Sequence, residues 1–180
     1  MADMILTLEG RHFKRQYLLY IIEIVHGNDI HYYIGQTGDH NYITARPAFR
    51  RLAGHLEDMG RSTQNQIYRY LAVQVLGLKE ANNKNVNFDD RIKQTVEDFL
   101  VSSTIRMHVY SLQEFIPSIE HEDHLKIVRK VTLFEQIVIR MFRLHQKKIA
   151  NKKITSLPED IECPYPEIMN RIQEDFNIKP

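Results

Sequence analysis

The chain has 180 residues and a formal net charge of +1, with 43% hydrophobic and 26% charged residues. These values favour one soluble domain with a real core. No apolar run approaches the ~20 residues of a membrane-spanning helix, so we expect no membrane association. Residues 1–10 lack a secretory signal pattern. The single cysteine, Cys163, cannot form an internal disulfide, so a cytoplasmic protein is expected.

The first half of the chain predicts a β-hairpin followed by helices. Residues 16–26 are rich in Ile, Leu, Val and Tyr and predict a strand, and residues 30–36 predict the returning strand. The cluster His-Gly-Asn-Asp at 26–29 is typical of the turn between them. Helices are expected over residues 47–59, from 62 or 63 to 76, and over 89–100.

The second half predicts one more strand and a long helix. Ile105, Met107 and Val109 alternate with polar or aromatic residues, so residues 104–112 predict a strand. Residues 122–149 carry an apolar stripe at helical spacing and predict a long helix. A short helix is expected near residues 166–176, after the prolines of the tail.

Glu135 is the most unusual residue of the long predicted helix. It is the only carboxylate between Asp123 and Glu159, and no cation stands three or four positions away to pair with it. A carboxylate on a largely apolar surface is costly unless something pairs with it. Its partner is either an arginine of another element, which would be purely structural, or a divalent cation; the residues alone leave the two alternatives even.

Four other side chains could take part in chemistry. Tyr20 and Tyr33 lie on the predicted hairpin, where tyrosine is usually a packing residue. Arg51 and His55 are four residues apart and project from one side of the predicted helix 47–59. Arginine matches phosphate oxygens and histidine can carry a proton near neutral pH, although on an exposed helix such a pair is more often simply solvated.

Charge is distributed unevenly along the chain. Residues 140–153 contain six Lys or Arg and no acid, residues 46–69 are also basic, and residues 154–180 are acidic. Such a pattern is compatible with a polyanionic partner. The simpler alternative is that these residues form solvated helix faces.

The sequence of the predicted hairpin resembles the two motifs of the GIY-YIG nuclease family. The segment Leu18-Leu19-Tyr20 stands where the family has Gly-Ile-Tyr, and Tyr33-Ile34-Gly35-Gln36-Thr37 stands at the second motif. Leu18 departs from the family's first glycine, and no lysine directly follows Gly35 as it does in some members.

The helical residues extend the resemblance. Arg51 and His55 match the family's helix with arginine followed four residues later by histidine, Glu135 matches its catalytic glutamate, and Asn151 matches its terminal asparagine by spacing. The resemblance implies an α+β fold: a small three-stranded antiparallel sheet flanked by helices. The nuclease-like domain would span residues 16–153, with a helical insertion at 77–103 and an acidic C-terminal extension at 154–180.

The resemblance also implies an activity, the metal-dependent hydrolysis of DNA phosphodiester bonds. Glu135 would bind one Mg²⁺ or Mn²⁺, Arg51 would stabilise the phosphorane, Tyr20 or Tyr33 would act on the attacking water, and His55 would assist a tyrosine. Gly35, Thr37 and Asn151 would support the site. The DNA backbone would be held by the basic residues Arg46, Arg50, Arg61, Arg140, Arg143, Lys147 and Lys148.

Two alternatives remain open from the sequence. The chain could be a nucleic-acid-binding module of the same fold with little or no cleavage, as the departure at Leu18 suggests. It could also be a protein-interaction module, as the near-zero net charge and the helical insertion suggest. If it is a nuclease with one site per chain, cutting both strands would need a homodimer or two binding events.

Overall fold

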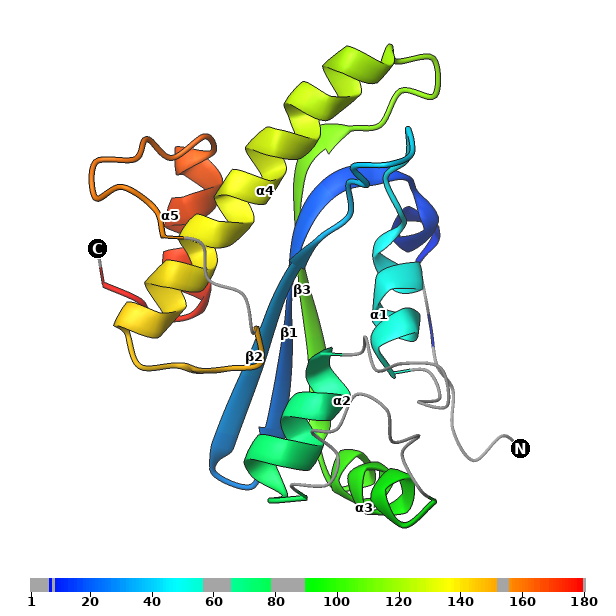
Figure 1. The fold of residues 1–180 in the computed structure, drawn as a ribbon, viewed down its shortest axis with the longest axis vertical. Coiled ribbons are helices and arrows are strands. Elements are labelled where there is room, and N and C mark those ends of the chain that lie inside the picture. Colours follow the sequence, from blue (N-terminus) through cyan, green and yellow to red (C-terminus); the bar gives the residue numbers. More distant parts are fainter. Residues whose placement is uncertain (1–6, 8, 57–65, 79–89, 152–155, 180) are drawn as a thin grey trace.

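The fold is α+β, with a four-stranded mixed sheet between two groups of helices (Figure 1). The structure, a computed structural model, describes residues 7, 9–56, 66–78, 90–151 and 156–179. The strand order is β3-β1-β2-β4. The strands are β1 (Gln16–His26), β2 (Asp29–Gln36), β3 (Thr104–Glu114) and β4 (Lys148–Ile149).

The hairpin and the third strand confirm the sequence prediction. β1 pairs antiparallel with both β2 and β3. It is buried along almost its whole length, because helices cover both faces of the sheet at this central strand. This explains why its sequence is nearly continuously apolar instead of alternating. Gly27, with a φ of 58°, closes the turn between β1 and β2.

One group of helices covers the face of the sheet that carries Tyr20 and Tyr33. The side chains of the two tyrosines share a core with residues of α1 (Ala48–Leu56), α2 (Gln66–Tyr70) and α3 (Asp90–Val101). A π-helical turn, η3 (Leu71–Val75), follows α2 directly. A short 3₁₀ helix, η1 (Gly10–Phe13), precedes β1 and contacts α1. The three predicted helices are thus present, although residues 57–65 and 89 lie outside the described part.

The opposite face packs against α4 (His121–Leu144) and α5 (Pro166–Asp175), which lie side by side in Figure 1. The α5 segment contributes Ile172, Phe176 and Ile178 to the same core as the β-strand residue Tyr32. The segment 156–179 is therefore packed onto the sheet and α4. The helical insertion 77–103 likewise contributes its described helix to the core on the other face.

The predicted long helix is wrong at its C-terminal end. It was expected to reach residue 149, but α4 ends at Leu144 and Gln146 takes a φ of 54°. The chain then reverses, and Lys148–Ile149 pairs with β2 as the parallel strand β4. The expected three-stranded antiparallel sheet is accordingly a mixed sheet of four strands. Within the described residues, no helix is both long and apolar enough to cross a membrane.

Candidate active site

Tyr20 and Gly35 meet at the centre of the candidate site. They are paired residues on β1 and β2. A Cβ atom added at Gly35 would overlap the hydroxyl and ring of Tyr20. The tyrosine side chain therefore crosses directly over the glycine of the second motif, and only glycine leaves room for it.

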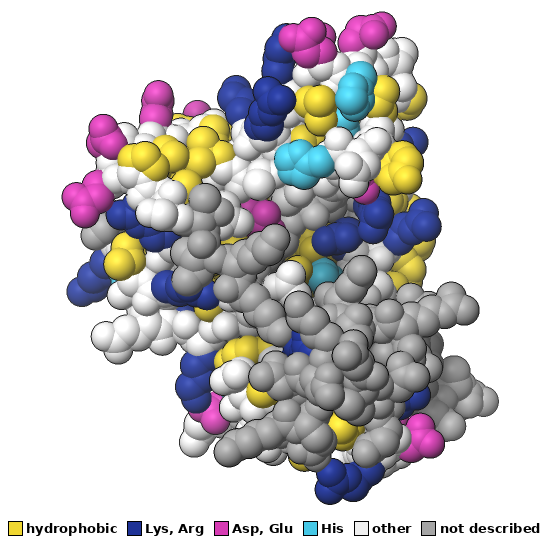
Figure 2. Space-filling model, in the orientation of Figure 1, with side chains coloured by type: hydrophobic (Ala, Val, Ile, Leu, Met, Phe, Trp, Pro, Cys, Tyr) yellow, Lys and Arg dark blue, Asp and Glu magenta, His cyan; other side chains and the backbone are white. Residues whose placement is uncertain are grey.

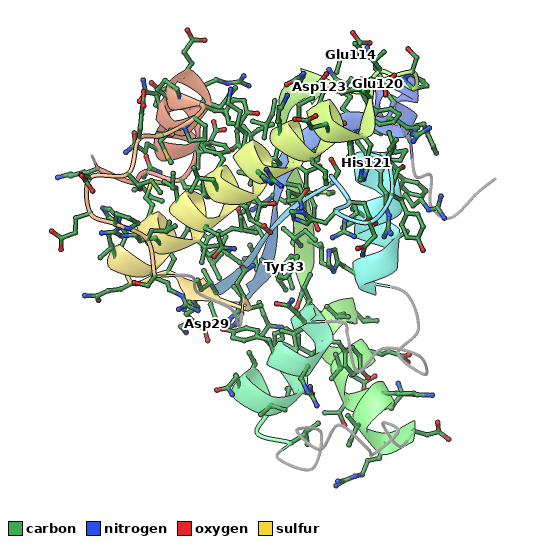
Figure 3. The ribbon with its side chains drawn as sticks, turned by 45° about the horizontal axis from the view of Figure 1, so that its top comes forward. Asp29, Tyr33, Glu114, Glu120, His121 and Asp123 are labelled. Carbon is green, nitrogen blue, oxygen red and sulfur yellow. The ribbon has the colours of Figure 1, made fainter. Side chains whose placement is uncertain are left out.

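Tyr33 lies on the same face of the sheet, with its ring centroid 6.3 Å from that of Tyr20. Both rings also contact His55, whose centroid is 5.7 Å from Tyr20 and 4.6 Å from Tyr33. In Figure 3, Tyr33 is seen between α1 and α4. The two tyrosines of the hairpin and the histidine of α1 therefore form one aromatic cluster.

Helix α1 brings Arg51 and His55 to this cluster. The helix follows Pro47, whose carbonyl accepts the backbone N–H of Arg51 at 3.2 Å, and it packs Ala48 and Leu52 into the core. Arg51 donates two hydrogen bonds to the Tyr20 hydroxyl, from Nε at 3.1 Å and from Nη2 at 2.9 Å. The spacing of four residues places His55 on the same side of the helix, as predicted.

The hydrogen-bond directions around the Tyr20 hydroxyl follow from the chemistry of its partners. Arginine can only donate, so the hydroxyl oxygen accepts from Arg51. The hydroxyl hydrogen is then available for Nε2 of His55, which lies 2.8 Å away. Burial and the nearby charge of Arg51 lower the pKa of His55 to about 4, so His55 is neutral at pH 7 and Nε2 can accept. Tyr20 therefore has a proton acceptor on one side and a cation on the other.

Glu135 belongs to α4, which packs on the opposite face of the sheet, but its charge acts on Tyr20, Tyr33 and Arg51. Its carboxyl is half-buried, and within the described part of the chain it makes no hydrogen bond or ion pair. Burial raises its pKa to about 7, and the opposing effect of the Arg51 charge is too small to restore the usual value. The structural alternative of a closed Glu–Arg ion pair is therefore not what the side chains form, although Arg51 is near enough for its charge to act.

The tyrosines are neutral phenols in this state. Burial is the main cause that raises the pKa of Tyr20 above its ordinary value, with smaller contributions from Tyr33 and Glu135, and Arg51 opposes the shift. Burial followed by the Glu135 charge raises the pKa of Tyr33 to about 12. A charge that neutralised Glu135 would favour the phenolate of both tyrosines, because Glu135 is one cause of both shifts.

The residues fit a single divalent cation at Glu135. An unpaired, half-buried carboxylate with a pKa raised by burial is a group that gains from a positive partner. No three His, Cys, Asp or Glu side chains of the described segments come together as a complete protein ligand set. A cation here would depend on Glu135, water and substrate oxygens, which is the coordination that Mg²⁺ tolerates.

Asn151 and Thr37 hold the end of β2 in place. The Asn151 side chain accepts the N–H of Ile34 at 2.9 Å and donates to its carbonyl at 2.7 Å. It therefore acts like one more residue of β4 beside β2. The Thr37 hydroxyl accepts the N–H of Leu18 at 3.1 Å and donates to the carbonyl of Gln16 at 2.6 Å. Both residues were expected from the resemblance, but these backbone contacts could not be predicted, because side-chain partners are not visible in a sequence.

Most of the predicted DNA-contacting residues have a polar partner within the fold. Arg46 lies 3.4 Å from Asp39, and Arg50 is exposed on α1. The last four residues of the predicted set all donate within the fold: Arg140 to the carbonyls of Leu157 and Pro158, Arg143 to that of Asn151, Lys147 to that of Phe176, and Lys148 to Asp29. Figure 2 shows basic side chains in several separate groups on this face. Arg61 lies outside the described residues, and a DNA-binding role for this set stays a prediction.

Comparison of the chain with protein-family models, with curated proteins and with solved structures finds no match. The functional interpretation therefore depends on the site itself.

Proposed function

We propose that the chain is a metal-dependent endonuclease that hydrolyses DNA phosphodiester bonds at a site of the GIY-YIG type. The observation that carries the proposal is the convergence of five residues from four elements: Tyr20 of β1, Tyr33 of β2, Arg51 and His55 of α1, and Glu135 of α4. Considered by itself, Glu135 could equally have been half of a structural ion pair with an arginine. An unpaired Glu135 beside an Arg–Tyr–His hydrogen-bonded group supports phosphoryl chemistry.

The substrate phosphate would be bound close to Arg51. Its guanidinium carries a fixed charge and presents planar donors that match phosphate oxygens. Charge that develops on those oxygens in the transition state would be stabilised by the same donors. A Mg²⁺ or Mn²⁺ ion held by Glu135 would act as a Lewis acid on the departing 3′ oxygen.

Tyr20 is the better placed of the two tyrosines to give up its proton, although its side chain is fully buried and its oxygen already accepts two hydrogen bonds from Arg51. Its hydroxyl hydrogen has an acceptor in His55, 2.8 Å away, and its oxygen is held by Arg51. When a phosphate neutralises Arg51, one cause of the low His55 pKa is removed, so His55 becomes a better base. Once the phosphate draws the Arg51 donors away from the Tyr20 oxygen and water reaches it, Tyr20 would take a proton from that water as its own proton passes to His55.

The test is cleavage of supercoiled plasmid in the presence of Mg²⁺ or Mn²⁺. We expect nicking or cutting by the native chain, and a loss of at least about 100-fold for Arg51→Ala, as for other donors to a developing charge. Arg50→Ala is the matched control, because Arg50 is the exposed neighbour on the same helix. Equal cleavage rates for Arg51→Ala and Arg50→Ala would exclude the proposal. If the native chain binds DNA but does not cleave it with either metal, a nucleic-acid-binding module is favoured instead.

A further inference from the structure

A polar cavity of about 330 Å³ lies between the α2–η3 segment, the end of α4 and β4. Its polar lining consists of Arg69, Tyr70, Gln74, Arg143 and Asn151. The volume is in the range of small-ligand sites. Asn151 also holds β2 beside the candidate active site and Arg143 is a predicted DNA contact, but none of the cavity residues is among the five residues proposed for the reaction.

The lining favours an anion. It holds two guanidinium groups and the amide of Gln74, and no carboxylate is among the described residues that line it. Arg69 is buried, at 6% exposure, and Arg143 is half-buried with one donor on the carbonyl of Asn151 at 2.8 Å. Arginine retains further donors after such a bond and presents them in a planar fork that matches phosphate. Arg69 was not among the predicted site residues, although a single cation in the apolar run Ile-Tyr-Arg-Tyr-Leu was a visible signal.

The cavity adjoins the candidate active site along the edge of β2. Asn151 lines the cavity and also binds the backbone of Ile34, which stands between Tyr33 and Gly35. Arg143 lies eight residues after Glu135 on α4, which is about 12 Å along the helix axis. A polyanion that reaches Glu135 could therefore extend past Arg143.

We propose that this cavity binds a backbone phosphate of the nucleic-acid strand, a few nucleotides from the bond at Glu135. The placement of this phosphate along the strand depends on the proposed function, whereas its binding can be measured without cleavage. Contacts of this kind set the register of a strand and carry no base specificity.

The test uses Gln74, because its side chain is exposed and lines the cavity. Gln74→Glu adds a negative charge beside the arginines, and Gln74→Lys adds a positive one. Gln113→Glu is the matched control, since Gln113 is exposed on β3 at the opposite edge of the sheet. The probe is a fluorescein-labelled duplex oligonucleotide in EDTA at low salt, followed by anisotropy.

We expect Gln74→Glu to weaken binding of the duplex by about tenfold and Gln74→Lys to strengthen it, with no change for Gln113→Glu. We also expect Arg143→Gln to reduce the slope of log affinity against log salt by about 1, the value for one phosphate contact. Equal affinities for the native chain and both Gln74 variants would overturn the proposal, as would absence of duplex binding by the native chain.

A second arm distinguishes a DNA phosphate from a free phosphate ion. If inorganic phosphate raises the Tm of the native chain but not of Gln74→Glu, while both bind the duplex equally, the cavity is a site for free phosphate and the proposal is overturned. The plasmid assay fails or succeeds separately. If Gln74→Glu weakens duplex binding but the native chain does not cleave, the phosphate site is supported and the nuclease proposal is excluded. If the native chain cleaves but Gln74→Glu binds the duplex as tightly as the native chain, the nuclease proposal is supported and the phosphate site is excluded.

Discussion

The Tyr20 hydroxyl lies over the backbone of Gly35, where a Cβ atom would overlap it. This contact gives the glycine of the second motif a physical reason that is independent of any family. The hydroxyl held there is the atom that Arg51 and His55 both contact. The glycine on β2 thus determines whether the β1 tyrosine can reach the two residues of α1.

Gly35→Ala should displace Tyr20 and break its hydrogen bonds to α1. Overpacking of a well-packed core costs about 1–3 kcal/mol, so the free energy of unfolding should fall by that amount in a urea titration. The control is Gly54→Ala, because outside the α1 backbone no atom of the described residues lies within 4 Å of a Cβ at Gly54. That variant should be neutral or more stable by about 0.5–1 kcal/mol. Equal stability for the two variants would contradict the close approach of Tyr20 to Gly35.

Tyr20→Phe should leave the Arg51 donors and His55 Nε2 without their shared partner. Each polar group left buried and unsatisfied costs about 1–3 kcal/mol, so we expect a loss of stability at neutral pH. Tyr110→Phe on β3 is a matched control outside the site, since its hydroxyl donates to Asp175 at 2.6 Å. Both changes should reduce stability, but only Tyr20→Phe should abolish plasmid cleavage. Loss of cleavage in both would indicate a folding effect.

His55 should titrate near pH 4, which NMR of its ring can measure. Burial is the larger cause of the low pKa and the Arg51 charge the smaller, so Arg51→Gln should raise the pKa of His55 partway toward its ordinary value. Because the folded pKa lies below the unfolded value of 6.5, the unfolded chain binds more protons between pH 6.5 and 4. The contribution of His55 to stability is therefore present above pH 6.5 and is lost as the pH falls through 4. A pKa near 6.5 in the native chain would contradict the buried, Arg51-facing position.

Glu135 should show the opposite pH dependence. Its folded pKa of about 7 lies above the unfolded value of 4.5, so its contribution is most favourable below pH 4.5 and is lost as the pH rises through 7. Glu135→Gln should therefore raise the free energy of unfolding at pH 8 by about 2 kcal/mol, with little effect at pH 4. Glu97→Gln, a change at an exposed position on α3, should leave the free energy of unfolding unchanged at both pH values. If Glu135→Gln destabilised the chain at pH 8, an ion pair would have to hold the carboxylate.

Asn151→Ala should loosen the edge of β2 beside the site. The variant loses both side-chain hydrogen bonds to the Ile34 backbone, and we expect a cost of about 1–3 kcal/mol. Hydrogen exchange should become faster at the Ile34 amide of β2. The amide of Ile24, near the C-terminal end of the neighbouring strand β1, should keep its protection. Unchanged protection at Ile34 would show that Asn151 does not replace a strand residue there.

The sequence predicted those parts of the fold that depend on local patterns. The continuous apolar run of β1, the alternation of β3 and the spacing of Arg51 and His55 are all local patterns, and each element is present. The two-residue strand β4 could not be predicted, because Lys148 and Ile149 continue an apparently helical, basic stretch and their pairing with β2 is non-local. The raised pKa of Glu135 follows from burial by segments far apart in sequence, which a one-dimensional pattern cannot measure.

The same distinction applies to the basic residues. The six cations of residues 140–153 predicted a charged surface, since a sequence records charge and not its partners. In the fold, Arg140 and Arg143 donate hydrogen bonds to backbone carbonyls, and Lys148 forms an ion pair with Asp29. The cavity with Arg69 and Arg143 joins residues from α2 and α4 that no local motif connects.

Plasmid cleavage by Glu135→Gln, compared with the native chain in Mg²⁺ at pH 8, is the most direct test of the proposed nuclease site. This variant is expected to be at least as stable as the native chain, so a loss of activity cannot be attributed to unfolding. We predict that the native chain cleaves and that Glu135→Gln loses at least about 100-fold of the rate, while Glu97→Gln retains it. Cleavage by Glu135→Gln at the native rate, or its absence from the native chain in both Mg²⁺ and Mn²⁺, would contradict the account.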